Sequence, residues 1–195
     1  PRSRRGPNTA LVRSDQTKTY GVDLTLSDQG TLVKDGYTFS GWNTAADGSG
    51  TSYAAGATYS VESGATLYAQ WTADTYTVTY DGNGFTGGTE PANQTKTHGV
   101  DLTLSDRGTL VRTGYTFVEW NTASDGSGTS YAESASYTNN ANLDLFAIWT
   151  ADTYTVTFEG NGNTGGTDPA DQTKTYGVDL TLSDQGTLVK AGYTF

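Results

Sequence analysis

Apolar and polar residues alternate along several short stretches of the chain, and this alternation predicts half-buried strands. In TYTVTYDGNG (residues 75–84), tyrosine and valine alternate with threonine until an Asp-Gly-Asn-Gly turn. In TKTHGVDLTL (residues 95–104), apolar residues recur at every second position from Val100 onward. We expect these two strands to form a hairpin. LDLFAIWT (residues 143–150) shows the same alternation and predicts a closing strand.

The remaining regular segments complete the expected fold. YTFVEWNT (residues 115–122) is aromatic and β-branched, which favours a strand. SDRGTLVR (residues 105–112) breaks the alternation, and its Ser-Asp start predicts a short helical turn whose Leu110 and Val111 face the core. The order is therefore strand, strand, short helix, strand, strand. It predicts an α+β, mostly β fold that is compatible with a β-grasp arrangement.

The whole pattern recurs along the chain with a period of 78 residues. The segment QTKT[YH]GVDL begins at Gln16, Gln94 and Gln172. Such self-similarity overrides any domain count based on length and predicts a tandem array. The predicted divisions are a non-repeat head, a first repeat without its opening strand, a complete second repeat and a third repeat without its closing strand: 1–15, 16–72, 73–150 and 151–195.

Each complete repeat carries two tryptophans, which are expected to form its core. A domain of this size buries only about 60% of its unfolded surface, and a tryptophan can bury about 150–250 Å². We therefore interpret the tryptophans and the neighbouring aromatic residues as structural core instead of ligand platforms. The predicted core residues are Trp42, Trp71, Trp120, Trp149, Tyr115 and Phe117.

Charge and composition narrow the range of functions. The formal net charge is −10, and four of the eleven basic residues lie in the head, which matches no later copy. We interpret the head as a cloning junction, not as a nucleic-acid arm. An acidic body argues against nucleic acid and against anionic membrane surfaces, and no apolar run reaches the length of a membrane-spanning helix. The absence of cysteine excludes disulfides and thiol chemistry within these 195 residues.

The sequence offers few groups for catalysis or metal binding. His98 is the only histidine, and tyrosine stands at its place in the other two copies. A histidine-based triad or zinc site is therefore not expected. The Asp-Gly turns offer weak calcium candidates at Asp47, Asp81 and Asp125, although turn chemistry explains these stretches equally well. No cofactor is expected.

The phrase GYTFSGWNT, followed by TLYAQWTADTYTVTYDGNG, resembles the Listeria–Bacteroides repeat, the B-repeat of internalin-type surface proteins. The resemblance extends over essentially all of residues 16–195. It implies a β-grasp-like module, often present in tandem, in extracellular or wall-associated bacterial proteins. It implies no catalytic residues.

Two functions remain open at this point. We expect a non-catalytic spacer or stalk module of a large bacterial surface protein. The alternative is a specific binding module for a host protein or a glycan, in which Val118, Phe146 and Ile148 of the second copy form an exposed apolar patch. The incomplete outer repeats further predict strand exchange between chains, or pairing with a strand from ALVRS (residues 10–14).

Overall fold

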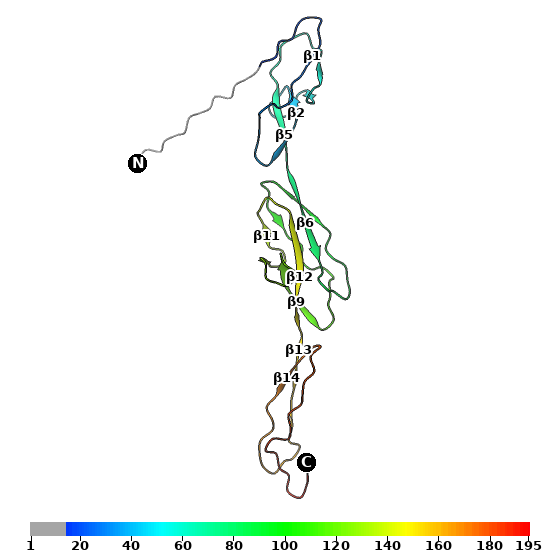
Figure 1. The fold of residues 1–195 in the computed structure, drawn as a ribbon, viewed down its shortest axis with the longest axis vertical. Helices are drawn as coiled ribbons and strands as arrows, with labels where there is room; N and C mark the ends of the chain where they lie inside the picture. Colours follow the sequence, from blue (N-terminus) through cyan, green and yellow to red (C-terminus); the bar gives the residue numbers. More distant parts are fainter. Residues whose placement is uncertain (1–14) are drawn as a thin grey trace, which may run out of the picture. The chain divides into compact units, whose positions relative to one another are not determined.

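The computed structural model describes residues 15–195, and within that range every regular element is a β-strand (Figure 1). The chain divides into two compact units, one ending at Asp74 and one comprising Thr75–Phe195. The described residues of the first unit hold the first repeat, and the second unit holds the other two. The predicted head lies outside the described residues except for Asp15.

The complete second repeat is built on a five-stranded sheet whose central strand is β12 (Leu143–Ala151). In Figure 1, β12 lies between β9 (Tyr115–Asn121) and β6 (Thr75–Asp81). It runs antiparallel to β9 and parallel to β6. The order is completed by β10 (Ser130–Tyr131) next to β9 and β7 (Gln94–Thr97) next to β6.

A second, two-stranded sheet covers one face of this repeat. It pairs β8 (Leu102–Thr103) with β11 (Ser136–Tyr137). The core consists of alternating side chains of the large sheet together with Tyr137 of β11 and residues that follow β8. Its buried members are Val78, Tyr80, Leu104, Leu110, Trp120, Tyr137, Leu143, Leu145 and Ala147.

The first unit repeats part of this plan. Its three-stranded sheet has β2 (Tyr37–Asn43) between β3 (Ser52–Tyr53) and β5 (Tyr68–Ala73). Its two-stranded sheet pairs β1 (Leu24–Thr25) with β4 (Thr58–Tyr59).

The third repeat contributes one antiparallel hairpin. It consists of β13 (Thr153–Val156) and β14 (Gln172–Thr175). Their register matches that of β6 and β7 in the second repeat, residue for residue.

The prediction of an α+β fold with a β-grasp arrangement was wrong, because residues 15–195 contain no helix and the fold is all-β. The segment predicted to be helical makes a turn around Gly108. Asp106 accepts a hydrogen bond from the Gly108 amide at 2.9 Å, so it caps a local turn, not a helix. Gly108 has a φ of 56°, a left-handed conformation that a right-handed helix cannot contain.

The residues after this turn pair with a distant loop. Val111 and Gly87 exchange backbone hydrogen bonds at 3.0 and 3.2 Å, so the backbone groups that a helix would use are satisfied elsewhere. Leu110 is buried as predicted, whereas Val111 is 52% exposed, opposite to the prediction.

The predicted second strand was partly misplaced. The strand that forms the antiparallel hairpin with β6 is β7, which precedes the apolar residues, while Val100 lies in a turn and is 59% exposed. Its amide donates to the Thr97 carbonyl at 3.1 Å. The side chain that faces the core from β7 is Lys96, which is fully buried.

Candidate functional site

The aromatic cluster of the second repeat depends on a β-bulge at Val118. Along β9 and β12, Ile148 pairs with Glu119 and Trp149 with Phe117, so Val118 has no partner across the strands. The extra residue rotates the strand and allows Phe117 and Trp120, three positions apart, to face the same side. It also directs Val118 outward, where it is 52% exposed.

The rings then meet edge to face. The Phe117 ring lies 5.3 Å from Trp120 and 5.5 Å from Trp149 between centroids, and Tyr80 lies 4.9 Å from Trp120. Both indoles donate hydrogen bonds to backbone carbonyls, Trp120 to Ser105 at 3.0 Å and Trp149 to Gly82 at 2.9 Å. Trp120 is fully buried, and Trp149 is half-buried.

The first unit has the same arrangement at its own bulge. Phe39 lies 5.2 Å from Trp42 and 5.6 Å from Trp71, and the Trp42 indole donates to the Ser27 carbonyl at 2.8 Å. Trp42 and Trp71 are both half-buried. The tryptophans thus lie in the packed interior of each repeat or at its margin.

The residue that sequence reasoning missed is the asparagine after the first tryptophan of each repeat. Asn121 is fully buried, and its Oδ1 accepts from the amides of Ala123 at 2.9 Å and Gly128 at 3.0 Å. Its Nδ2 donates to the Gly126 carbonyl at 3.2 Å. Asn43 does the same in the first unit. The Trp-Asn-Thr triplet present in both copies was the available signal.

This asparagine organises the Asp-Gly-Ser-Gly loops that were weak calcium candidates. Asp47 and Asp125 each accept from the amide and the hydroxyl of the serine two residues later, at 2.7 to 3.1 Å. The serine hydroxyl, and then its amide, hold the pKa of each carboxyl below its ordinary value. Asp81 accepts from the Asn83 amide at 2.7 Å. No group of three or more histidine or acidic side chains converges on a metal position in residues 15–195.

The three residues of the predicted apolar patch differ in exposure. Phe146 and Ile148 are half-buried on the sheet face opposite the core, and Gly126 of the neighbouring loop lies close to the Ile148 side chain. Val118 is the most exposed of the three predicted patch residues. His98 is half-buried at the turn after β7, with its Nδ1 3.4 Å from the Tyr76 hydroxyl.

A lysine anchors one edge of each repeat. In the first unit, Lys18 forms an ion pair with Glu62 at 3.0 Å. At the equivalent positions of the second repeat, the buried Lys96 donates to the Asn140 side-chain oxygen at 3.0 Å and to the Thr97 carbonyl at 2.9 Å. The repeats therefore preserve the lysine while its partner changes from a carboxylate to an amide.

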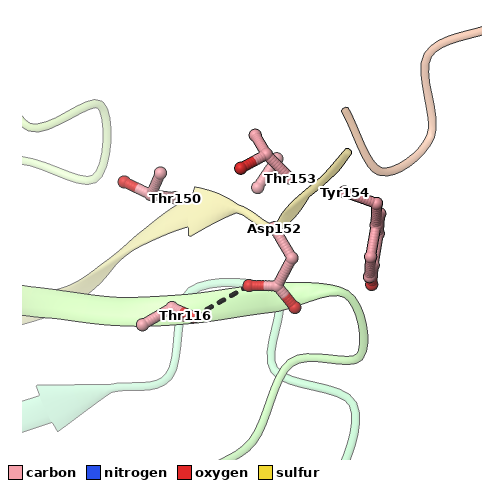
Figure 2. A pocket seen from close by; sticks show the side chains of 6 residues that line it. Thr116, Thr150, Asp152, Thr153 and Tyr154 are labelled. Atoms are coloured by element: carbon pink, nitrogen blue, oxygen red, sulfur yellow. Dashed lines mark hydrogen bonds between the residues drawn. The ribbon is translucent and has the colours of Figure 1, made fainter. Parts of the chain in front are cut away.

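A polar depression of the second unit lies where the second repeat continues into the third (Figure 2). It is lined by Thr116, Thr150, Ala151, Asp152, Thr153 and Tyr154. The dashed line in Figure 2 marks the hydrogen bond from the Thr116 hydroxyl to Asp152 Oδ1, which measures 2.8 Å. The depression is lined mainly by hydroxyl side chains, together with Ala151 and the Asp152 carboxylate, which already accepts the Thr116 hydrogen bond.

Together, these features define the class of protein, an all-β tandem-repeat protein. The residues that distinguish its repeats stabilise the fold of each repeat. The chain belongs to the Listeria-Bacteroides repeat domain family, whose model matches residues 5–70, 76–148 and 154–195. The predicted resemblance is thereby confirmed. The first match begins inside the segment assigned to the head. The family is a non-catalytic type of module.

Two relatives come from Evansella cellulosilytica. One, described as a Gly-rich membrane protein, is 38% identical over 192 residues, covering 93% of this chain and 22% of the relative. The other, described as a membrane protein, is 34% identical over 126 residues, covering 64% of this chain and 19% of the relative. The chain thus spans about a fifth of the length of each. No solved structure matches it. Within residues 15–195, no helix is present that could cross a membrane.

Proposed function

We propose that the chain is a spacer segment of a large bacterial cell-surface protein, exposed outside the cell, in which repeats in tandem set the distance between other parts. The observation that carries this proposal is the spacing of the repeats. Only Asp152 separates β12 of the second repeat from β13 of the third. With a connection of one residue, the third repeat follows the second directly along the chain.

The chemistry of the described residues also supports a mechanical role. The polar side chains singled out above are occupied within the repeats: the buried asparagines hold loops, the acidic turn residues cap turns, and the lysines anchor edges. No buried side-chain nitrogen or oxygen in residues 15–195 lacks a partner. A net charge of −10 keeps repeats soluble and mutually repelling.

Small-angle scattering tests the spacer role directly. We expect residues 15–195 in solution to give the pair-distance distribution of an elongated particle. A single compact globule would contradict the proposal. Location is tested separately, by adding protease to intact cells that carry the full-length protein; resistance of the repeats to cleavage would contradict an exposed position.

A binding role is a second candidate, and one observation favours it. Val118, Phe146 and Ile148 occur only in the second repeat, where the first repeat has Ser40, Tyr68 and Gln70. If a host protein or glycan binds this face, the triple substitution V118S/F146Y/I148Q should abolish binding to host surface extracts and glycan arrays. The reverse triple substitution in the first repeat is the matched control, and it should create binding there.

A further inference from the structure

The residue that joins the second and third repeats is held by both of them. The Asp152 amide donates to the Gly114 carbonyl at 2.9 Å, and Asp152 Oδ1 accepts from the Thr116 hydroxyl at 2.8 Å. The Asp152 carbonyl accepts from the Tyr176 amide at 2.8 Å. Two bonds therefore attach this linker residue to the second repeat and one attaches it to the third.

A ring of the third repeat rests on the backbone of the second. A β-carbon at Gly114 would lie 2.3 Å from Tyr176 Cγ, a distance at which no side chain fits. Gly114 also has a φ of 75°, which favours glycine. The Tyr176 ring meets the Tyr115 ring edge to face at 5.6 Å, and the Arg112 guanidinium lies 4.2 Å from the Tyr115 centroid on the same turn.

We infer that Gly114, Tyr115, Thr116 and Asp152 form a docking seat for the tyrosine of the following repeat, and that this contact fixes the angle between the two repeats. The partner that fits the seat is another module of the same kind, presenting the Thr-Tyr-Gly turn that follows β14. The biological meaning of this inference rests on the proposed spacer role. A fixed angle at the seat would make the spacer stiff instead of freely jointed.

The receiving half of the seat recurs in the first unit. There the Asp74 amide donates to the Gly36 carbonyl at 2.9 Å, and the Thr38 hydroxyl donates to Asp74 Oδ1 at 2.7 Å. These are the bonds of Asp152, Gly114 and Thr116 in the same geometry. The first and second repeats therefore share the receiving half of the seat.

The absence of cysteine from the chain makes the angle measurable. Spin labels at A132C and A170C, two exposed positions in the second and third repeats, report the distance between them by pulsed electron paramagnetic resonance. We expect one narrow distance distribution. The substitution Tyr176→Ala removes the ring, and we expect the narrow peak to be lost; Tyr176→Phe keeps the ring and should keep the peak.

Two controls separate this effect from unfolding. Tyr20→Ala changes the equivalent tyrosine of the first repeat, which is 87% exposed, and should leave the distribution unchanged. A second label pair at A170C and A191C, both within the third repeat, should keep its distance in Tyr176→Ala.

Three results would overturn the inference: a broad distribution in the otherwise unsubstituted chain, no change in Tyr176→Ala, or loss of the distance within the third repeat together with the peak. A freely jointed array could still be an extended spacer at the cell surface, so these results would leave the proposed function standing. Failure of the protease test would instead reject surface location without affecting the seat.

Discussion

Trp120 and Trp42 occupy the same position of successive repeats but differ in burial. Trp120 is fully enclosed by Tyr80 and Phe117, whereas Trp42 is half-buried although it makes the same indole hydrogen bond. Tyr80, which packs edge to face on Trp120, belongs to β6. In the described residues of the first unit, no counterpart of Tyr80 packs on Trp42.

The substitution Trp120→Ala should therefore destabilise the second repeat strongly. Replacing a buried tryptophan by alanine costs about 3–5 kcal/mol, and it also leaves the Ser105 carbonyl without its donor. Trp42→Ala should cost less. Urea denaturation followed by far-UV circular dichroism measures both, with Val118→Ala, at an exposed bulge, as a control that should stay within about 0.5 kcal/mol of the unsubstituted chain.

The stability of the first unit and that of the second repeat should respond differently to acid, because Lys18 pairs with a carboxylate and Lys96 with an amide. The hydrogen bond from Lys18, followed by that from the Gly21 amide, holds the pKa of Glu62 below its ordinary value of 4.5. Because the folded-state pKa is the lower one, the pair stabilises the first unit above pH 4.5, and that contribution is lost as the pH falls through the lowered folded value. The second repeat has Asn140 at this position, and its amide does not titrate there.

The test is to compare the melting temperature of the unsubstituted chain with that of Glu62→Asn between pH 7 and pH 3. We expect the unsubstituted chain to melt higher at pH 7 and the difference to shrink below pH 4.5. The effect is modest because the Glu62 side chain is 39% exposed. A difference that does not depend on pH would contradict this account.

At the scale of elements, the sequence predicted most strands because their alternation is local. The strands β6 and β9 lie within stretches that were predicted from apolar alternation and aromatic content, and β12 extends its predicted stretch by one residue. The other elements depended on distant partners. Gln94–Thr97 became a strand through pairing with β6, and the segment around Gly108 gave its hydrogen bonds to the loop at Gly87, so a local capping pattern was misleading.

The bulge and the asparagine-centred loop were missed for a related reason. A bulge appears as an ordinary strand in a list of residues, because only the register with β12 reveals that Val118 is unpaired. Asn121 looks like a turn residue in the sequence, and its role as a buried organiser requires the return of the chain at Gly128. The sequence predicted which aromatic residues make up the candidate site. It did not predict the bulge that brings their rings together or the contact between the second and third repeats.

Gly108→Ala distinguishes the observed turn from the predicted helix by the sign of its effect. In a helix this substitution would stabilise the protein by about 1 kcal/mol. At a φ of 56° it should destabilise the second repeat by about 1–2 kcal/mol, because an L-residue is strained there. Gly64→Ala is the control, since its added β-carbon meets open space and its φ lies outside the left-handed region. Chemical denaturation measures both, and a gain in stability for Gly108→Ala would contradict the turn.

At the scale of the whole molecule, the repeat period was accessible from sequence alone, since identical phrases return every 78 residues. The incomplete outer repeats were also predicted from the sequence, and the register of the sheet adds which of their residues would pair. In the second repeat, β12 has β9 on one side and β6 on the other. Among the described residues, β5 pairs only with β2, and β13 pairs only with β14. The contact between β12 and β6 joins residues 143–146 to residues 78–81. The equivalent segments are residues 65–68 of the first repeat and 156–159 of the third, of which only Tyr68 and Val156 lie in strands.

We expect a polypeptide of these 195 residues to self-associate head to tail through residues 65–68 of one copy and residues 156–159 of another, paired as residues 143–146 and 78–81 are in the second repeat. Such contacts are heterologous, so they give a series of oligomers that grows with concentration. Sedimentation velocity at increasing concentration measures this. Val156→Lys should abolish association, because its equivalent Val78 is fully buried beside β12, whereas Thr155→Lys, at a position whose equivalent Thr77 is exposed, should not. A monomer at every concentration, or equal association by both variants, would show that these two segments do not pair between copies.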